Sequence, residues 1–224
     1  SIVSNVASNA ADSVKELSGS NITSSLKSSL VYDSRNKRFN TTRGSKHMIS
    51  AEYAGLGGTI GFTKIIAETG WYFPVFWKFT GFLHGKAGYV NENGDMLLPD
   101  YEKFFLGGMN SVRGYGWQDL APTEINSVGE VAYVGGDKFL QFNSELRFPL
   151  VEEAGVIGLV FFDAGEVYAM EEQVEIGSLS KSAGFGVRWY SPMGPIRLEN
   201  AYILDPVPGG AEGSKWEFSM GAAF

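Results

Sequence analysis

The sequence lacks cysteine entirely and has only two histidines among its 224 residues. Without cysteine, disulfide scaffolds, zinc fingers and thiol catalysis are excluded. No run approaches 18 apolar residues, so no segment qualifies as a transmembrane helix. Positive charge is also scarce: 18 Lys and Arg stand against 25 Asp and Glu, for a formal net charge of -7. This balance, without a basic stripe, argues against nucleic acid as a partner.

The two histidines, His47 and His84, do not have the spacing of metal ligands. No Ser-His-Asp arrangement stands out around either of them. We therefore expect both to be solvated or to lie in an aromatic girdle, and the sequence predicts no catalytic residue, no metal and no cofactor.

The first 20 residues differ in pattern from the rest of the chain. Apolar residues recur at spacings of three and four from Val3 to Leu17, and Gly19 follows them, which predicts a short helix. The segment has neither a basic n-region nor an apolar h-region, so it is not a signal peptide. We expect that a signal was removed or that the chain begins partway through a longer protein.

From about residue 21 apolar and polar residues alternate, which is the period of β-strands. Between residues 139 and 150, for example, Phe142 and Leu146 alternate with Asn143 and Glu145. Nine segments follow this pattern: 22–33, 46–56, 62–73, 76–90, 139–150, 154–169, 182–191, 195–204 and 215–224. The sequence thus predicts an all-β protein with nine strands.

Three further features favour a transmembrane barrel over a soluble sandwich. Charged residues lie on the polar face of nearly every strand, and aromatics such as Trp71, Trp77 and Trp189 lie near strand ends. Short joints at 74–76, 149–155 and 191–195 contrast with long loops near 91–137, 169–180 and 205–214. Aromatic girdles, strands of about ten residues and unequal loops are typical of bacterial transmembrane antiparallel β-barrels. Such a closed sheet pairs every backbone polar group that lies in lipid.

Nine is an odd number, whereas bacterial single-chain barrels have an even number of strands. We therefore interpret residues 21–224 as the C-terminal part of a larger barrel that includes an inward-folded loop at 91–137. Residues 1–20, with the short helix, would then belong to an extracellular loop.

The stretch "FFLGGMNSVRGYGWQDLAP", residues 104–122, interrupts the alternation with four glycines, four aromatic residues and one arginine. It resembles the sixth extracellular loop of the BamA-like barrels, the POTRA-bearing assembly and secretion barrels of the outer membrane. The family's VRG[F/Y] motif is present as Val112, Arg113, Gly114 and Tyr115, and the family's glycine pair as Gly107 and Gly108.

Other segments resemble the same family in order and spacing. They are "YDSRNKRFNTTRG" (a periplasmic turn), "NSELRFPL" and "VFFDAGEVY" (the two strands after the loop), "SPMGPIRLENAY" (the next hairpin) and "FSMGAAF" (the last strand). The resemblance covers nearly the whole chain from about residue 21. It implies a larger barrel, which we expect to have sixteen strands, in the bacterial outer membrane.

In this family the loop folds back into the lumen, and its arginine meets acidic residues of the inner wall. The resemblance therefore implies that Arg113 pairs with Glu145 and Asp163. The alternation independently places Glu145 on the polar face of its strand, and the segment 154–169 is apolar on both faces until Asp163. Arginine can satisfy two carboxylates at once with its planar fork of donors. We expect an anchored plug.

The last strand carries Trp216, Phe218, Gly221 and Phe224. The resemblance implies that this strand forms a lateral seam, at which a client strand could add by β-augmentation. The implied function is to fold and insert client barrels without enzymatic chemistry. The implied partners are the lipid bilayer, client outer-membrane proteins, the missing N-terminal strands, POTRA domains and accessory lipoproteins.

Two alternatives remain open at this point. One is a secretion barrel of the two-partner or TamA type. The other, from a different class, is a passive porin-like channel, in which the VRGY motif would have no acidic partner. A barrel enzyme would need a catalytic set around His47 or His84, which the sequence does not contain.

Overall fold

The computed structural model describes residues 2–3, 15, 17–191, 194–207 and 211–221. In these ranges the chain forms thirteen strands and two short 3-10 helices: β1 (Ile2–Val3), β2 (Gly19–Ser20), β3 (Ser25–Asp33), β4 (Gly44–Ala54), β5 (Phe62–Pro74), β6 (Thr80–Glu92), η1 (Asp100–Glu102), β7 (Thr123–Ile125), β8 (Val131–Tyr133), β9 (Lys138–Val151), β10 (Val156–Tyr168), η2 (Ile176–Ser178), β11 (Ser180–Ser191), β12 (Gly194–Ile203) and β13 (Ser214–Met220). Within the described part of the chain, no helix has the length and apolar character needed to cross a membrane.

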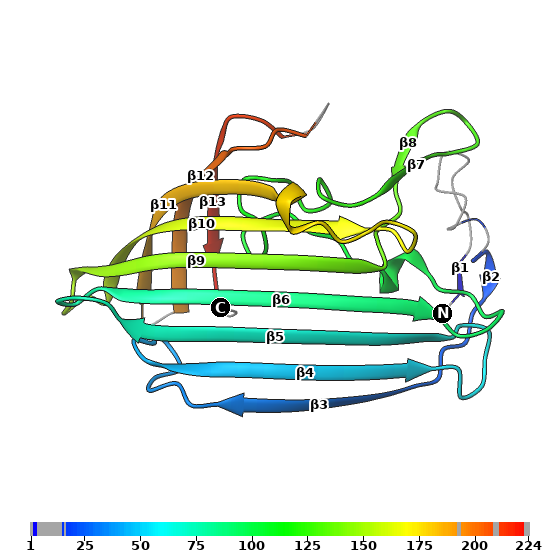
Figure 1. The fold of residues 1–224 in the computed structure, drawn as a ribbon, viewed down its shortest axis with the longest axis horizontal. Coiled ribbons are helices and arrows are strands. Elements are labelled where there is room, and N and C mark those ends of the chain that lie inside the picture. Colours follow the sequence, from blue (N-terminus) through cyan, green and yellow to red (C-terminus); the bar gives the residue numbers. More distant parts are fainter. Residues whose placement is uncertain (1, 4–14, 16, 192–193, 208–210, 222–224) are drawn as a thin grey trace.

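Among the described residues, nine strands form one antiparallel sheet in the order β13-β12-β11-β10-β9-β6-β5-β4-β3 (Figure 1). The nine predicted strands are thereby confirmed. Neighbours in the sheet are neighbours in sequence except for β6 and β9, which pair across the long loop 93–137. Of the last predicted strand, residues 222–224 lie outside the described residues.

The two ends of the sheet differ in the length of their connections. At one end, which we call the short-turn end, residues 34–43, 75–79 and 152–155 join successive strands. The opposite end carries the 45-residue connection 93–137 as well as 169–179 and 204–213. In bacterial transmembrane barrels short turns face the periplasm and long loops face the exterior.

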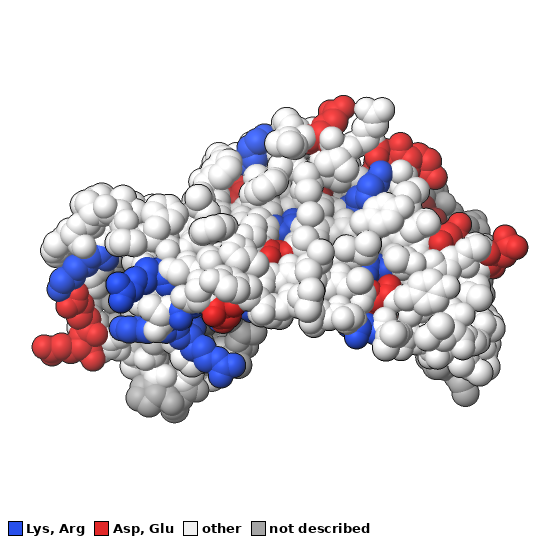
Figure 2. Space-filling view, turned by 60° about the horizontal axis from the view of Figure 1, so that its bottom comes forward, with Lys and Arg blue, Asp and Glu red and all other residues white. Residues whose placement is uncertain are grey.

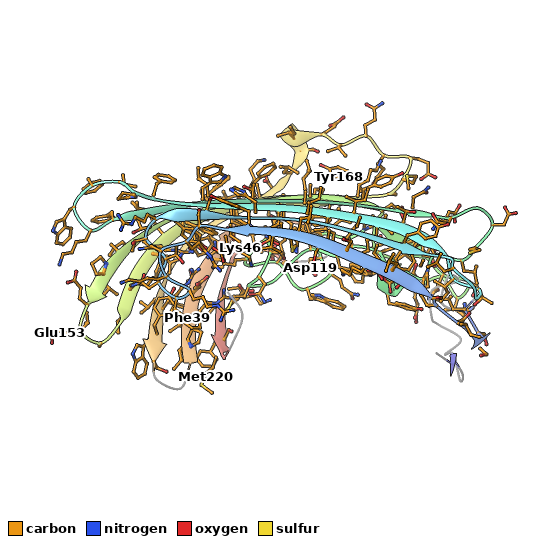
Figure 3. All side chains as sticks on the ribbon, turned by 90° about the horizontal axis from the view of Figure 1, so that it is seen from below. Phe39, Lys46, Asp119, Glu153, Tyr168 and Met220 are labelled. Carbon is orange, nitrogen blue, oxygen red and sulfur yellow. The ribbon has the colours of Figure 1, made fainter. Side chains whose placement is uncertain are left out.

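The sheet is arched, and loop 93–137 lies on its concave side, as Asp119 of that loop shows (Figure 3). Alternation along each strand separates the two faces. Outward side chains such as Trp71, Leu83 and Phe142 are 54%, 50% and 44% exposed. Inward side chains such as Asp163 are buried. The convex face is therefore apolar and the concave face polar, which is the arrangement that a barrel wall needs between lipid and lumen.

The concave side also holds an apolar cluster that joins the loop to the wall. From the loop come Phe104, Leu106, Val112, Tyr115 and Leu120, and from the wall and its connections Ala54, Ile60, Phe62, Val90, Phe139, Val167 and Ile203. Burial of this much apolar surface is favourable at roughly 25 cal/mol per Å². The loop is thus packed on the wall and is not a slack connection.

The N-terminal segment differs in part from the prediction of a helix over residues 1–19. Ile2–Val3 pairs antiparallel with Gly19–Ser20, so the ends of the segment form a two-stranded ladder. Lys15 is helical, and most of the remaining predicted helix lies outside the described residues. The prediction was wrong at the ends because Ile and Val favour strands. The spacing of apolar residues, on which the prediction was based, takes no account of this preference.

Candidate functional site: an arginine-anchored loop in the lumen

The loop reverses direction tightly around the VRGY motif. The Gly108 N–H donates to the Tyr115 carbonyl at 2.9 Å, and the Gly107 N–H donates to Ser111 Oγ at 2.8 Å. Gly114 has a φ of +93° and lies against Ala201 and Ile203 of β12, where a Cβ would meet side-chain carbons at 3.1 and 3.2 Å. A residue without a side chain is needed there, and the tight turn places Arg113 against the wall.

Arg113 is 3% exposed and binds three carboxylates. Its Nε and Nη2 donate to the two oxygens of Asp163 at 2.6 and 2.7 Å, and its backbone N–H donates to the same carboxylate at 3.2 Å. Its Nη1 donates to Glu145 at 2.9 Å and to Glu199 at 2.8 Å. This is the bidentate geometry in which arginine binds carboxylates most strongly.

The flat side of the guanidinium also contacts the wall. Its Cζ lies 3.5 Å from the ring centroid of Phe161 on β10, which is a cation–π geometry. Burial alone would lower the pKa of Arg113, but its hydrogen bonds to Asp163 and the charges of Asp163, Glu145 and Glu199 raise the pKa above its ordinary value. Arg113 therefore stays charged over the whole pH range in which proteins are folded.

Two wall arginines complete the charge cluster. Arg188 on β11 donates from Nε to Glu199 at 2.7 Å and from Nη1 and Nη2 to Glu145 at 3.0 and 2.7 Å. Arg147 on β9 donates from Nε to Glu145 at 2.7 Å. Three arginines thus meet three carboxylates, and this balance matters because an uncompensated buried charge is strongly destabilising.

Further hydrogen bonds from Asn143 and Arg197 hold the loop tip. Asn143 Nδ2 donates to the Ser111 carbonyl at 2.7 Å and to Asp163 Oδ1 at 2.8 Å. Arg197 Nη2 donates to Asn110 Oδ1 at 2.9 Å and to the Met109 carbonyl at 3.3 Å. The sequence reasoning assigned no role to Asn143, Arg147, Arg188, Arg197 or Glu199. The sequence indicated only that each of these residues lies on the polar face of an alternating strand.

A cavity of about 360 Å³ adjoins the loop tip and opens toward the short-turn end. Its lining includes Arg35 and Arg38 of the turn 34–43, Lys46 of β4 and Glu68 of β5, together with Arg113 and the wall arginines. Lys and Arg side chains gather toward one end of this side of the molecule (Figure 2). The concave face is thus polar and hollow beside the plug, as expected for a lumen.

Tyr115 is fully buried beside the anchor, and its hydroxyl faces the Asp205 carbonyl at 2.8 Å and the Lys181 carbonyl at 3.0 Å. Burial, together with the nearby charge of Asp205, raises the pKa of Tyr115 to about 12. The hydroxyl proton is needed for donation, so the folded state retains the proton to higher pH than the unfolded chain.

We expect Tyr115 to reduce stability at alkaline pH. Its unfolded pKa is about 10 and its folded pKa is about 12. Below pH 10 both states are protonated and the hydroxyl contribution is complete. Between pH 10 and 12 the unfolded chain loses the proton first, so the free energy of unfolding falls. Unfolding midpoints measured between pH 8 and 12 report this decrease, and the decrease should be smaller in Tyr115→Phe. The same decrease with pH in the variant and the wild type would contradict a raised pKa at Tyr115.

The last-strand residues lie apart from the anchor. Trp216 and Phe218 point outward and are 59% and 67% exposed, and the Trp216 ring packs edge-on against Phe185 of β11. β13 ends at Met220, and Gly221 follows with a φ of +112°. The predicted seam residue Phe224 lies outside the described residues.

Neither histidine lies in a metal-binding cluster, and the described residues contain no group of His, Asp or Glu that could hold a metal ion. His84 faces the lumen, with Nδ1 at 2.9 Å from Asn143 Oδ1 and Nε2 at 3.3 Å from Glu68. His47 lies on the outer face between the rings of Tyr32 and Trp71.

An arched antiparallel sheet with an apolar outer face, a polar inner face and a long loop ion-paired to the inner wall defines part of an outer-membrane β-barrel with an inward-folded loop. The family model described as the Omp85 superfamily domain matches residues 2–224. The chain belongs to this superfamily, and it is a β-barrel protein of the bacterial outer membrane.

Several relatives are named assembly proteins. The outer membrane protein assembly factor BamA of Nitratidesulfovibrio vulgaris is 32% identical over 221 residues, which cover 96% of this chain and 27% of that protein. BamA of Neisseria meningitidis is 30% identical, over 82% of this chain and 26% of that protein. The sorting and assembly machinery component 50 homolog of Xenopus tropicalis is 31% identical, over 65% of this chain and 30% of that protein.

A solved structure shares the fold. The crystal structure of BamA from Haemophilus ducreyi lacking POTRA domains 1-3 superposes with a TM-score of 0.76 at 22% identity, over 86% of this chain and 41% of that chain. The chain spans about a quarter of the length of the BamA relatives. It corresponds to the C-terminal barrel portion of a BamA-like protein, as the sequence resemblance predicted.

Proposed function

We propose that this chain is the part of an outer-membrane assembly factor that carries the lumen plug and the last strand of the barrel, and that the protein folds and inserts client β-barrels. One observation carries the proposal: Arg113 binds Asp163, Glu145 and Glu199 inside the concave face. A loop held in this way braces β9, β10 and β12 from within. The names of the relatives, which are assembly factors and assembly machinery, support the same function.

In this proposal the work is done by backbone pairing, and no reaction chemistry or cofactor takes part. The last strand forms a lateral seam, with Trp216 and Phe218 toward lipid and Gly221 weakening the strand end. A client strand adds to that edge through main-chain hydrogen bonds. The partners are the lipid bilayer, client outer-membrane proteins, further barrel strands, POTRA domains and accessory lipoproteins.

The Arg113 ion pairs disfavour one of the two alternative functions but not the other. A passive porin-like channel predicts a VRGY motif without acidic partners, and the three carboxylates around Arg113 disfavour that reading. A secretion barrel of the two-partner or TamA type would use the same anchor. The named functions of the relatives favour assembly over secretion.

A charge swap in the full-length protein tests the proposal. Arg113→Glu places a fourth carboxylate among three buried ones, so we expect loss of client insertion into vesicles and loss of the heat-modifiable folded band on gels. Combining it with Asp163→Arg restores one opposite pair and should recover part of both signals.

The matched control is Lys103→Glu, which makes the same charge change in the same loop; among the described residues Lys103 forms a single ion pair, a long one of 3.8 Å to Asp100. It should insert clients like the wild type. If Arg113→Glu also behaved like the wild type in both assays, the plug would have no part in assembly and the passive-channel reading would return.

A further inference from the structure

The outer face of the sheet contains a groove at the centre of β5, β6, β9 and β10. It has a volume of about 290 Å³ and is lined by the outward-facing residues Thr69, Trp71, Leu83, Gly85, Phe142, Ser144 and Phe162, together with His84 and Asn143, whose side chains face the lumen. All four strands have both neighbours present in the sheet (Figure 1). The groove is therefore complete in this chain and does not depend on further strands.

The register explains why a groove forms at this place. Gly85 pairs with Thr69 on one side and Phe142 on the other, and Ser144 pairs with Leu83 and Phe162. Side chains at these positions point outward, so two small residues lie side by side among large ones. Trp71, Leu83, Phe142 and Phe162 rise around them as walls. A missing side chain at Gly85 thus opens a hollow in a face that is otherwise covered by bulky groups.

A hydrogen-bonded chain fixes one wall of the groove. Trp71 Nε1 donates to Thr69 Oγ1 at 2.9 Å, and the same hydroxyl lies 2.7 Å from His47 Nδ1. His47 Nε2 lies 2.9 Å from Ser45 Oγ, and the His47 ring packs edge-on against Trp71 at 4.9 Å. With every ring nitrogen bonded, these groups are tolerated against lipid, and the indole ring is held in one orientation.

We propose that this groove is a lipid-binding site that holds the end of one acyl chain of a bilayer lipid. The groove is continuous with the apolar outer face, which in an outer-membrane barrel is covered by lipid. An empty groove would lose dispersion contacts along its whole lining, and a cavity of only ~150 Å³ lined by apolar side chains already takes up benzene. A flexible hydrocarbon chain matches both the shape and the chemistry of the lining.

The depth of the groove places it near the middle of the membrane. Gly85 is the sixth residue of β6, which starts at the short-turn end with Thr80. Five residues span about 16 Å along a strand, or roughly 12 Å of depth for a strand tilted by about 40°. Half of an apolar band of about 25 Å is also about 12 Å, so the groove lies near the middle of the membrane, where the ends of acyl chains lie.

The test fills the groove in the full-length protein. Gly85→Leu projects a side chain into it, and the fold should tolerate the change because a Cβ at Gly85 meets only ordinary contacts, at 3.6 Å from Thr69 and 3.7 Å from Phe142. The matched control is Ala87→Leu, an outward position of the same strand that does not line the groove. Both proteins are reconstituted in vesicles of phosphatidylcholine, extracted in detergent and examined by native mass spectrometry.

We expect the wild type and Ala87→Leu to retain one phosphatidylcholine after mild activation and Gly85→Leu to lose it. A second readout uses a variant in which Trp71 is the sole tryptophan. Its fluorescence should be quenched by dibrominated phosphatidylcholine, and the quenching should persist after transfer to unbrominated vesicles, except when Gly85→Leu is added.

Two results would overturn the proposal. One is equal lipid retention and equal persistence of quenching in Gly85→Leu and Ala87→Leu, provided that both proteins show the heat-modifiable band of the folded barrel. The other is retention of a second protein copy in place of lipid by the wild type, which would make the groove a protein contact. Gly85→Ala, a smaller filler, should give an intermediate loss.

Discussion

Asp163→Asn is expected to release the loop from the lumen, and the release can be read as trypsin cleavage after Arg113. In the wild type this bond is protected because Arg113 is 3% exposed. Removing one partner of a buried ion pair costs roughly 3–5 kcal/mol, which corresponds to a rise of roughly 10²- to 10⁴-fold in the released population. Cleavage that follows the open population should accelerate by a similar factor.

The reason lies in how the carboxylates share their cations. Asp163 accepts three of the five hydrogen bonds that Arg113 donates to carboxylates, and among the described residues Arg113 is its only cationic partner. Glu199 is bound by Arg113 and also by Arg188, which itself keeps two bonds to Glu145. Loss of Asp163 therefore removes three of the five carboxylate hydrogen bonds of Arg113, whereas loss of Glu199 removes only one.

Glu199→Gln is the matched control, because Glu199 is as deeply buried as Asp163 and also binds Arg113. Its cleavage after Arg113 should rise far less than that of Asp163→Asn. The cleavage site is verified by mass spectrometry of the fragment beginning at Gly114. Equal protection of Arg113 in both variants would show that the apolar contacts of the loop suffice and that the ion pairs add nothing to anchoring.

The alternation in the sequence was enough to predict the nine strands and the face on which each side chain lies. Glu145 could be placed on the inner face because Phe142 and Leu146 beside it face outward. Asp163 could be selected because it is the first charge of a strand that is apolar before it. These inferences need only the two-residue period of a strand. Arg113 was selected on other grounds, namely its glycine-rich surroundings and the resemblance to a known family.

The rest of the cluster depends on register, which the period does not fix. Arg188 and Glu199 both face inward, but their contact requires Gly186 to pair with Glu199 and Arg188 with Arg197 across β11 and β12. A shift of two residues that paired Arg188 with Pro195 would keep both faces and separate the charges. The outer groove also depends on register, since Gly85 and Ser144 become diagonal neighbours only through the pairing of β6 with β9.

The second large effect is expected at Gly107, the first glycine of the pair in the loop. Gly107 has a φ of +128°, which is open to glycine almost alone, and a Cβ there would overlap the carbonyl oxygen of Gly116. Gly107→Ala combines backbone strain with a steric overlap, for roughly 2–6 kcal/mol. The turn that presents Arg113 should then open, and hydrogen exchange of the peptide 104–122 should accelerate.

Gly108 provides the comparison within the same pair. Its φ is +89°, but a Cβ there would meet nothing within 4 Å. Gly108→Ala therefore adds only the strain of a left-handed backbone, about 1–2 kcal/mol, and the peptide should exchange only slightly faster than in the wild type. Similar exchange in the two variants would mean that the packing of Gly107 on Gly116 does not hold the turn. A difference between them would show that close backbone contact, as well as the Arg113 ion pairs, keeps the loop in the lumen.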